Sequence, residues 1–208
     1  MMEEKKDLRT EEKGIGAFTE ALASSAPTPA GGGASALAGA VGASLGMMVA
    51  NLTTGKKKYA RYEQELQELI PRLEKLRKRF LRLADEDEAL FMPLSRAYKL
   101  PRDTAEEQEA RARVMETCLE GACRVPVETM EACLEALSVM HRLSHIGTRL
   151  AVSDVGIAAR LLWASMSGAF LNVVINTREM QDRQRAEELY RHGEALLSEG
   201  RACSEAVY

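Results

Sequence analysis

The chain has 208 residues, of which 46% are hydrophobic, 28% charged and 5% aromatic, and its formal net charge is −3. This length suits one domain with a single core, and the charge balance argues against a nucleic-acid-binding protein. Aromatic and β-branched runs are scarce, which disfavours β-sheets. The sequence therefore predicts one all-α domain over residues 1–208.

A short helix is predicted to begin near residue 16, and residues 24–33, rich in Pro, Ser and Gly, predict a loop after it. The loop ends in three consecutive glycines, Gly31, Gly32 and Gly33. We expect them to form a turn with freedom at positive φ and with backbone N–H groups bare of side chains. Because this loop leads into a helix N-terminus, it can receive an anionic or carbonyl-rich ligand.

The next predicted helix, residues 34–54, carries no charged side chain. Small residues recur along it at spacings of three and four, which gives one face that another backbone can approach closely. These residues are Ala36, Gly39, Ala40, Gly42, Ala43 and Gly46. Gly55 is expected to end the helix. Lys56 and Lys57 follow directly, where they either complement the helix dipole or meet a polyanionic substrate tail.

A long amphipathic helix is predicted over residues 59–98, with an apolar stripe that alternates spacings of three and four. At position 87 the stripe calls for an apolar residue, and the sequence has Asp87 instead. We expect this carboxylate to face the core or a cleft, where desolvation favours its protonated form and suits it to acid–base catalysis. A buried ion pair is the other interpretation. Asp85 lies about 200° around the helix and is expected to face solvent.

Three further helices are predicted, over residues 105–143, 155–176 and 181–206. Asp103 or Thr104 is expected to cap the first of them, in a capping box with Glu106 or Glu107. Two runs of the chain carry no charged residue: residues 24–55 are long enough for a membrane span, and residues 161–177 are somewhat short. Their Ala, Gly, Ser and Asn content favours buried core helices, so we predict no membrane contact. Long surface helices would enclose them in a single-domain bundle or in a dimer.

Asn172 and Asn176 lie one turn apart on the second of these apolar helices. Two buried amides need partners, which either a heterocyclic ligand or neighbouring protein groups could provide. Asp154 stands at the predicted start of the same helix, where an N-cap is the favoured role. No metal site is predicted, because His141 and His145 lack a third ligand. Four cysteines without a paired motif are typical of a reduced, cytoplasmic protein.

Taken together, these features resemble the cyclodeaminase/cyclohydrolase family of folate enzymes. That family comprises the C-terminal half of formimidoyltransferase-cyclodeaminase and stand-alone bacterial methenyltetrahydrofolate cyclohydrolases. The resemblance covers nearly the whole chain and rests on the order and separation of several segments. They are PTPAGGG at 27–33, the small-residue helix, TTGK at 53–56, DEDEA at 85–89, and Ser153-Asp154 ahead of NVVIN at 172–176.

The resemblance implies an all-α homodimer whose substrate is a tetrahydrofolate carrying a one-carbon unit, with no further cofactor. Cyclodeaminases are lyases that close formimidoyltetrahydrofolate to methenyltetrahydrofolate with loss of ammonia. Cyclohydrolases are hydrolases that open methenyltetrahydrofolate to formyltetrahydrofolate. The resemblance also implies that an acid at Asp85 or Asp87 is catalytic, and the apolar stripe makes us prefer Asp87.

Chemistry and resemblance together suggest which residues bind the substrate. In this interpretation the backbone at Gly31, Gly32 and Gly33 holds it, Asn172 and Asn176 bind the pterin, Lys56 and Lys57 meet the glutamate tail, and Asp154 is a further candidate.

Two segments depart from the family pattern. The glycine loop of the family usually reads PGGGS, whereas here Ala30 replaces the first Gly and Gly33 stands where Ser is expected. Gly147-Thr148 stands where Gly-Asn is expected. We therefore carry three functions: a cyclodeaminase first, a cyclohydrolase second, and a non-catalytic folate-binding or scaffold protein third. For the enzyme we expect a cytoplasmic protein, with a small-molecule folate and a second copy of the chain as its partners.

Overall fold

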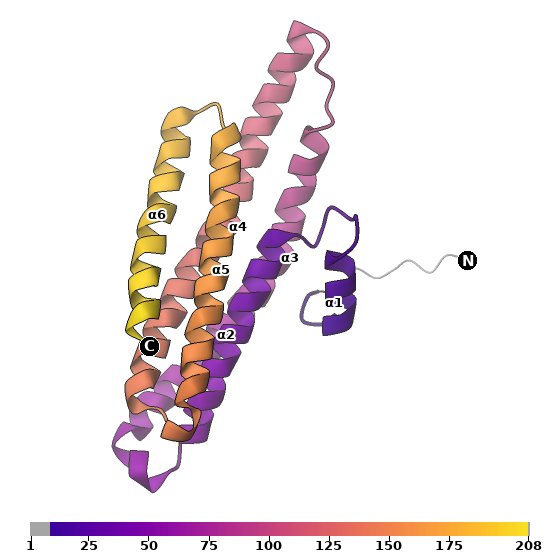
Figure 1. Ribbon diagram of the computed structural model, residues 1–208. Helices are drawn as coiled ribbons and strands as arrows, with labels where there is room; N and C mark the ends of the chain where they lie inside the picture. Colours follow the sequence, from indigo (N-terminus) through magenta and orange to yellow (C-terminus); the bar gives the residue numbers. More distant parts are fainter. Residues whose placement is uncertain (1–8, 208) are drawn as a thin grey trace, which may run out of the picture.

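The computed structural model describes residues 9–207, and every regular element in that range is a helix (Figure 1). The predicted all-α fold is therefore confirmed. The α-helices are α1 (Ile15–Leu22), α2 (Gly31–Thr53), α3 (Glu63–Ala97), α4 (Ala105–Ile146), α5 (Val152–Glu179) and α6 (Arg183–Ala206). Two 3-10 helices, η1 (Lys57–Tyr62) and η2 (Arg149–Ala151), lie in the connections before α3 and α5.

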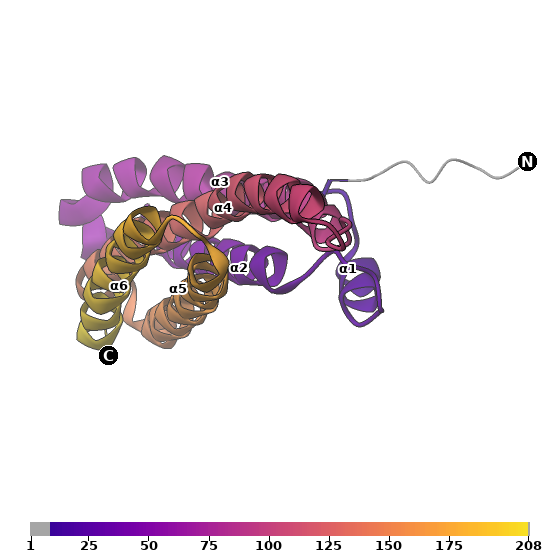
Figure 2. The same cartoon turned by 90° about the horizontal axis from the view of Figure 1, so that it is seen from above.

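The five long helices α2 to α6 lie side by side in an elongated bundle, and α1 stands beside it near the start of α2 (Figures 1 and 2). Helix α2 packs against α3, α4 and α5, while α6 covers α4 and α5. The main core contains fully buried side chains from four of these helices, among them Phe80, Leu137, Met140 and Leu162. Burial of such side chains is the main stabilising term of the bundle.

The small residues of α2 allow this packing. A Cβ atom on Gly39 would overlap the ring of Phe80, and one on Gly46 would overlap the side chain of Met140. A Cβ atom on Gly42 would lie 2.9 Å from Leu162 Cγ. The predicted close approach along this helix is confirmed, since α3, α4 and α5 each contact a position where α2 lacks a side chain.

The glycine segment at the start of α2 differs from the prediction. Gly31, Gly32 and Gly33 form the first turn of α2, with Ala30 as the extended N-cap residue, and none of the three has a positive φ. Within residues 9–207, positive φ occurs only at Gly55, at 76°, where it ends α2 as expected. The expected loop is thus a helix start. Of its three glycines, only Gly32 lies where a Cβ atom would overlap another side chain.

Helices α2 and α5 are not enclosed within one chain. Each buries one face and leaves apolar side chains on the other: Val41, Met48 and Leu52 on α2, and Val152, Ile157, Leu171 and Ile175 on α5. We call these seven residues the α2–α5 face. Length and composition alone would let both helices cross a membrane, but core helices of soluble proteins meet the same criteria.

Helices α3 and α4 extend beyond the rest of the bundle and meet in a hairpin (Figure 1). Thr104 caps α4: its Oγ1 accepts the N–H of Glu107 at 3.2 Å, and the Glu107 side chain accepts the N–H of Thr104 at 3.0 Å. The predicted capping box is confirmed. Pro71 and Pro93 lie inside α3, and Pro126 lies inside α4.

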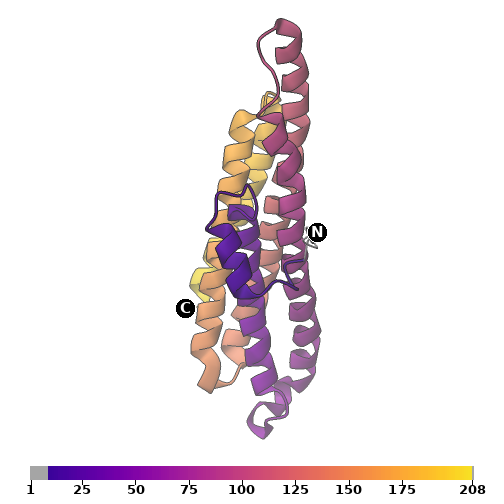
Figure 3. The same ribbon diagram turned by 90° about the vertical axis from the view of Figure 1, so that its right-hand side faces the viewer.

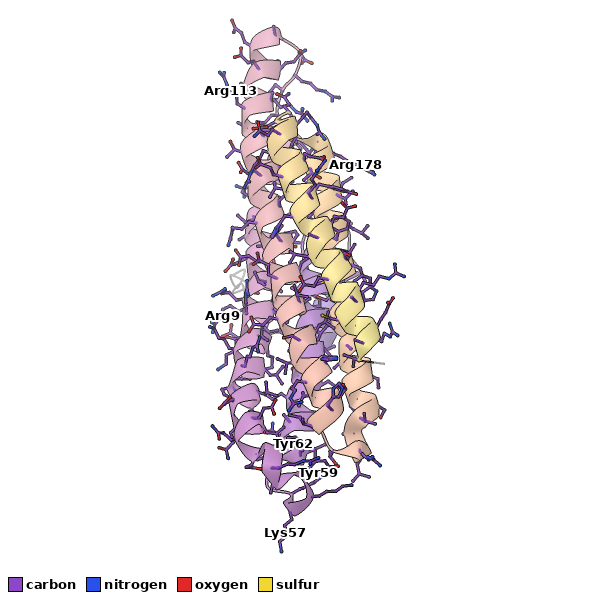
Figure 4. All side chains as sticks on the ribbon, turned by 90° about the vertical axis from the view of Figure 1, so that its left-hand side faces the viewer. Arg9, Lys57, Tyr59, Tyr62, Arg113 and Arg178 are labelled. Atoms are coloured by element: carbon purple, nitrogen blue, oxygen red, sulfur yellow. The ribbon has the colours of Figure 1, made fainter. Side chains whose placement is uncertain are left out.

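The other end of the bundle joins α2, α4 and α5. The N–H of Thr148 donates to Thr53 Oγ1 at 2.9 Å, and Lys56 Nζ lies 3.5 Å from Thr148 Oγ1. The N–H of Arg149 donates to the hydroxyl of Tyr59 at 3.2 Å. Figure 4 shows Lys57 and Tyr59 at this end, far from Arg113 at the other.

Candidate active site

Asp87 faces a cavity of about 100 Å³ at the point where α2 begins between α3, α4 and α5. The site depends on helix lengths: α2 starts partway along the bundle, whereas α3 and α5 continue past its first residue with α4 between them (Figure 3). The cavity is lined by Ala30, Gly32, Asp87, Leu90, Phe91, Ala122, Val125, Pro126, Asn172, Ile175 and Asn176. The expectation that Asp87 faces a cleft on the apolar side of its helix is met by this geometry.

The first turn of α2 lies directly against the Asp87 carboxylate. A Cβ atom on Gly32 would overlap that carboxylate, so any other residue at this position would have to displace Asp87. The backbone N–H of Gly33 donates to Asp87. A free carboxylate at the N-terminus of a helix meets both unpaired N–H groups and the positive end of the helix dipole. The glycines therefore hold the acid in place, a role different from the flexible turn that their composition suggests.

Burial is the main cause of an altered pKa at Asp87. Desolvation raises the pKa of this carboxyl group from 3.8 to about 6, and the charge of neighbouring Glu88 raises it further, while the hydrogen bond from Gly33 acts in the opposite direction. An acid with this pKa is mostly ionised at neutral pH but still exchanges protons readily. Such a group can take a proton from a nucleophile and return it to a leaving group.

Glu88 holds the segment that leads into α2. It accepts a hydrogen bond from Thr28 Oγ1 at 2.8 Å, and Lys13 Nζ lies 3.8 Å from its carboxylate. The segment before Gly31 is thus fastened to α3, one residue beyond the candidate acid. This contact fixes the register between the start of α2 and the α3 turn that carries Asp87.

Asp85 does not line the Asp87 cavity. It is half-buried rather than solvent-facing, because its Oδ1 accepts both the N–H of Thr10 at 2.8 Å and the Thr10 hydroxyl at 2.6 Å. The expectation that Asp85 faces solvent is therefore wrong: the chain before α1 returns to cover it. The geometry assigns Asp85 an anchoring contact and leaves Asp87 as the acid of the cavity.

Asn172 and Asn176 both line the cavity from α5 and are half-buried. The amide of Asn172 donates to the carbonyl of Gly168 at 3.3 Å, which leaves its oxygen to accept another hydrogen bond. The side chain of Asn176 is hydrogen-bonded to Cys123, whose pKa is raised to about 11 mainly by burial. Both amides thus lie on one helix face, as their spacing predicts, and the structure shows that this face lines the same cavity as Asp87.

Three of the proposed binding residues lie elsewhere. Lys56, Lys57 and Asp154 are at the opposite end of the bundle, about 33 Å from Gly31 by the length of α2. Within one chain they cannot join the Asp87 cavity. Asp154 is also not the N-cap of α5, because that position belongs to Ala151 and Asp154 lies in the first helical turn.

Sequence reasoning missed two side chains beside the cavity. Phe91 lies four residues after Asp87 and lines the same space, so helical spacing could have found it. Cys123 contacts Asn176 from α4, and no pattern in the sequence indicates this pairing. Among residues 9–207, no group of three His, Cys, Asp or Glu side chains is placed to hold a metal ion.

Known proteins match this chain both in sequence and in fold. Residues 14–194 match the family model described as "Formiminotransferase-cyclodeaminase". The chain is 39% identical to a methenyltetrahydrofolate cyclohydrolase of Methylorubrum extorquens over 93% of both chains. It is 31% identical to the formimidoyltransferase-cyclodeaminase of Gallus gallus, over 94% of this chain but only 36% of that protein. The crystal structure of formiminotetrahydrofolate cyclodeaminase from Thermotoga maritima superposes with a TM-score of 0.84 at 26% identity, covering 95% of this chain and 94% of that one.

Proposed function

This chain belongs to the formiminotransferase-cyclodeaminase family of folate one-carbon enzymes, and on that basis we propose that it is a methenyltetrahydrofolate cyclohydrolase. The sequence alone puts a cyclodeaminase first. We reverse the order because the relative that is 39% identical along nearly its whole length carries the cyclohydrolase name. The observation that supports the chemistry is the half-buried Asp87 carboxylate, with its pKa raised to about 6, in the cavity beside the first turn of α2.

In the proposed reaction, Asp87 serves first as a base and then as an acid. The methenyl carbon is bonded to two nitrogens of the folate and is electron-poor. Water attacks this carbon and transfers a proton to the Asp87 carboxylate. The bond from the resulting tetrahedral carbon to one nitrogen then breaks, and that nitrogen takes the proton back from Asp87. The hydroxyl on the carbon loses its own proton to solvent and becomes the carbonyl of the formyl group. The products are formyltetrahydrofolate and the regenerated carboxylate, so no further cofactor is required.

The surrounding residues have roles that fit this chemistry. Asn172 and Asn176 offer amide donors and acceptors to the pterin edge, which presents both kinds of group. Phe91 provides an apolar surface beside the reacting carbon. Because the cavity is small, the one-carbon unit and the adjacent ring edge would lie inside it, and the remainder of the folate would extend along the bundle.

A cyclodeaminase remains the second candidate, because the Thermotoga maritima structure with the same fold carries that name. In that reaction a folate nitrogen attacks the formimidoyl carbon and ammonia leaves. The proton removed from the attacking nitrogen and the proton given to ammonia could both pass through Asp87. The same acid in the same cavity thus serves either reaction, and the two substrates distinguish them.

Absorbance tests this proposal directly. With methenyltetrahydrofolate, the near-ultraviolet band of the substrate should fade faster than in buffer alone at neutral pH. Asp87→Asn should lower kcat by at least about 100-fold, as expected for loss of a general base. Glu86→Gln is the matched control, since this neighbouring acid pairs with Arg82 and Arg124 outside the cavity.

Three results would change the assignment. A band that grows with formimidoyltetrahydrofolate, without hydrolysis of methenyltetrahydrofolate, would favour the cyclodeaminase. Full activity in Asp87→Asn would exclude the proposed mechanism. Absence of either activity in the wild-type protein would contradict an enzyme of this kind.

We further propose that the protein is a soluble homodimer that pairs through the α2–α5 face. Val41 is 48% exposed on α2, a helix with no charged residue, and Ile157 is 51% exposed on α5. An apolar surface of this kind on a soluble protein is typical of a contact between subunits.

A further inference from the structure

A second cavity, of about 390 Å³, lies where the α3–α4 hairpin meets the start of α6. Its walls carry Arg102 and Arg111 with Gln108 from the hairpin side, and Glu116 and Glu179 from the bundle side. The chemistry proposed above does not use this space. It is lined by α4 and α5, as the Asp87 cavity is, and its two arginines make it a candidate site for an anionic group.

Arg111 lacks a partner although it is partly buried. Its Nε is inaccessible to solvent and has no hydrogen-bond acceptor, and in the described part of the chain neither Arg111 nor Arg102 forms an ion pair. An unpaired buried donor of a charged group is costly to stability. A guanidinium in this condition fits a planar anion such as a carboxylate, which it can bind through two parallel hydrogen bonds.

The two acids of the cavity are already engaged. Glu116 accepts the N–H groups of Gln181 and Asp182, at 2.6 and 3.0 Å, before the start of α6. Glu179 accepts the hydroxyl of Tyr98 at 2.7 Å, and the pKa of Tyr98 is raised to about 12, so this phenol remains a donor. Both carboxylates are held by neutral donors, which leaves Arg111 available to a ligand.

The two cavities lie along the same pair of helices. On α4, Ala122 lines the first cavity and Arg111 the second, about 16 Å apart along the helix. On α5, Asn176 and Glu179 are separated by less than one turn. Buried apolar side chains from α3 and α4, including Leu94 and Leu119, lie between these positions. Phe91 packs against this cluster and is only partly buried where it lines the first cavity, so the aromatic ring of a folate arm could stack beside it.

We propose that the second cavity binds the glutamate part of the folate substrate, with Arg111 pairing to its α-carboxylate. Arg102, exposed at the hairpin, meets the carboxylate of an additional glutamate when the folate carries a longer tail. This assignment rests on the proposed function for the identity of the substrate. It replaces Lys56 and Lys57, which lie at the opposite end of the bundle.

Binding of a matched pair of ligands tests this subsite. The probes are 5-formyltetrahydrofolate and 5-formyltetrahydropteroate, which differ only in the glutamate, and the measurement is the dissociation constant by titration calorimetry. Arg111→Met should weaken binding of the folate about tenfold, as expected for loss of a hydrogen-bonded charge, and leave binding of the pteroate unchanged. Arg113→Met is the control, since Arg113 is exposed on the same helix and pairs with Glu109 (Figure 4).

The possible outcomes separate the subsite from the proposed function. Wild-type protein that binds the two probes equally, or an Arg111→Met variant that loses both to the same degree, would overturn the glutamate subsite while leaving the folate activity intact. Wild-type protein that binds neither probe would overturn both proposals. A variant that loses only the glutamate-bearing probe supports the subsite even when turnover is not measured.

Discussion

At the residue scale, two carboxylates separated by one residue have opposite environments. Asp85 accepts two hydrogen bonds from Thr10, whereas Asp87 lies in a cavity that disfavours its charge. The same four-letter acidic run therefore contains an anchor and a candidate proton carrier. Which acid is which depends on the helical turn, because positions 85 and 87 point in nearly opposite directions.

The raised pKa of Asp87 predicts a cost to stability. Its folded pKa, about 6, lies above the ordinary value of 3.8, so the native state binds this proton more tightly than the unfolded chain. The free energy of unfolding therefore falls as the pH rises from about 4 to above 6, and the loss persists at higher pH. The neutral variant Asp87→Asn avoids this loss, and its amide oxygen can still accept the N–H of Gly33.

We expect Asp87→Asn to be more stable than the wild type by about 1–3 kcal/mol at about pH 8, the lower end applying because the side chain is partly exposed. At about pH 3, below the ordinary pKa of 3.8, both states hold the proton and the difference should nearly vanish. Urea unfolding at the two pH values measures it. An equal difference at both would show that packing, and not ionisation, separates the two proteins.

The apolar stripe of α3 was sufficient to single out Asp87 from the sequence, since a carboxylate stood where an apolar residue was required. The environment of Asp85 could not be predicted in this way, because Thr10 lies 75 residues away. Arg111 gave no signal either. It is one of many charged residues on an amphipathic helix, and its missing partner is visible only in three dimensions.

At the scale of single elements, the start of α2 has the most specific contacts. Three glycines in a first helical turn are unfavourable by propensity, at up to about 1 kcal/mol each relative to alanine. At Gly32 the space of a side chain is taken by the Asp87 carboxylate. Gly32 is a weak helix former, but its missing side chain leaves space for the Asp87 side chain of α3.

Gly32→Ala should therefore displace the Asp87 carboxylate and lower kcat by roughly tenfold or more, since small errors in position are costly to proton transfer. Gly156→Ala is the matched control: it also adds one methyl group inside a helix, but nothing lies within 4 Å of the added atom. Steady-state kinetics and thermal unfolding of both variants separate the effects. Equal activity of the two would contradict the proposed contact.

Helix existence was predictable from periodicity, and the boundaries of α4 and α6 were close to those expected. The start of α2 was not, because Pro and Gly content favours a loop until a tertiary contact decides otherwise. The N-cap of α5 was missed for a related reason. The short η2 helix ends at Ala151, and α5 begins at the next residue. Asp154 therefore lies in the first turn of α5 and not at its N-cap.

At the scale of the whole molecule, the α2–α5 face is the feature that a single chain leaves unexplained. The nearly uncharged sequences of α2 and α5 predicted a buried environment, yet each helix is buried on one side only. Gly42 of α2 lies against Ala158 and Leu162 of α5, so exposed Val41 and Ile157 flank the contact between the two helices. A second copy on this surface would complete the burial.

We expect the double variant Val41→Glu, Ile157→Glu to sediment as a monomer where the wild type sediments as a dimer, because four charges would enter an apolar contact. Val114→Glu is the control, since Val114 is 44% exposed but lies on α4, outside the proposed contact. Sedimentation equilibrium gives the masses. A monomeric wild type, or a variant that stays dimeric, would place the subunit contact elsewhere or remove it.

The junction of Thr53, Thr148 and Lys56 has a mechanical consequence. Separating α2 from the segment that follows α4 would leave the buried N–H of Thr148 without a hydrogen-bond acceptor, which is costly. At the opposite end, the hydrogen bond from Tyr98 to Glu179 is exposed to solvent, and a buried apolar cluster that includes Leu94 and Met115 packs the helices together. The two ends of the bundle are thus held differently, by a buried polar contact at Thr148 and by apolar packing near Arg111.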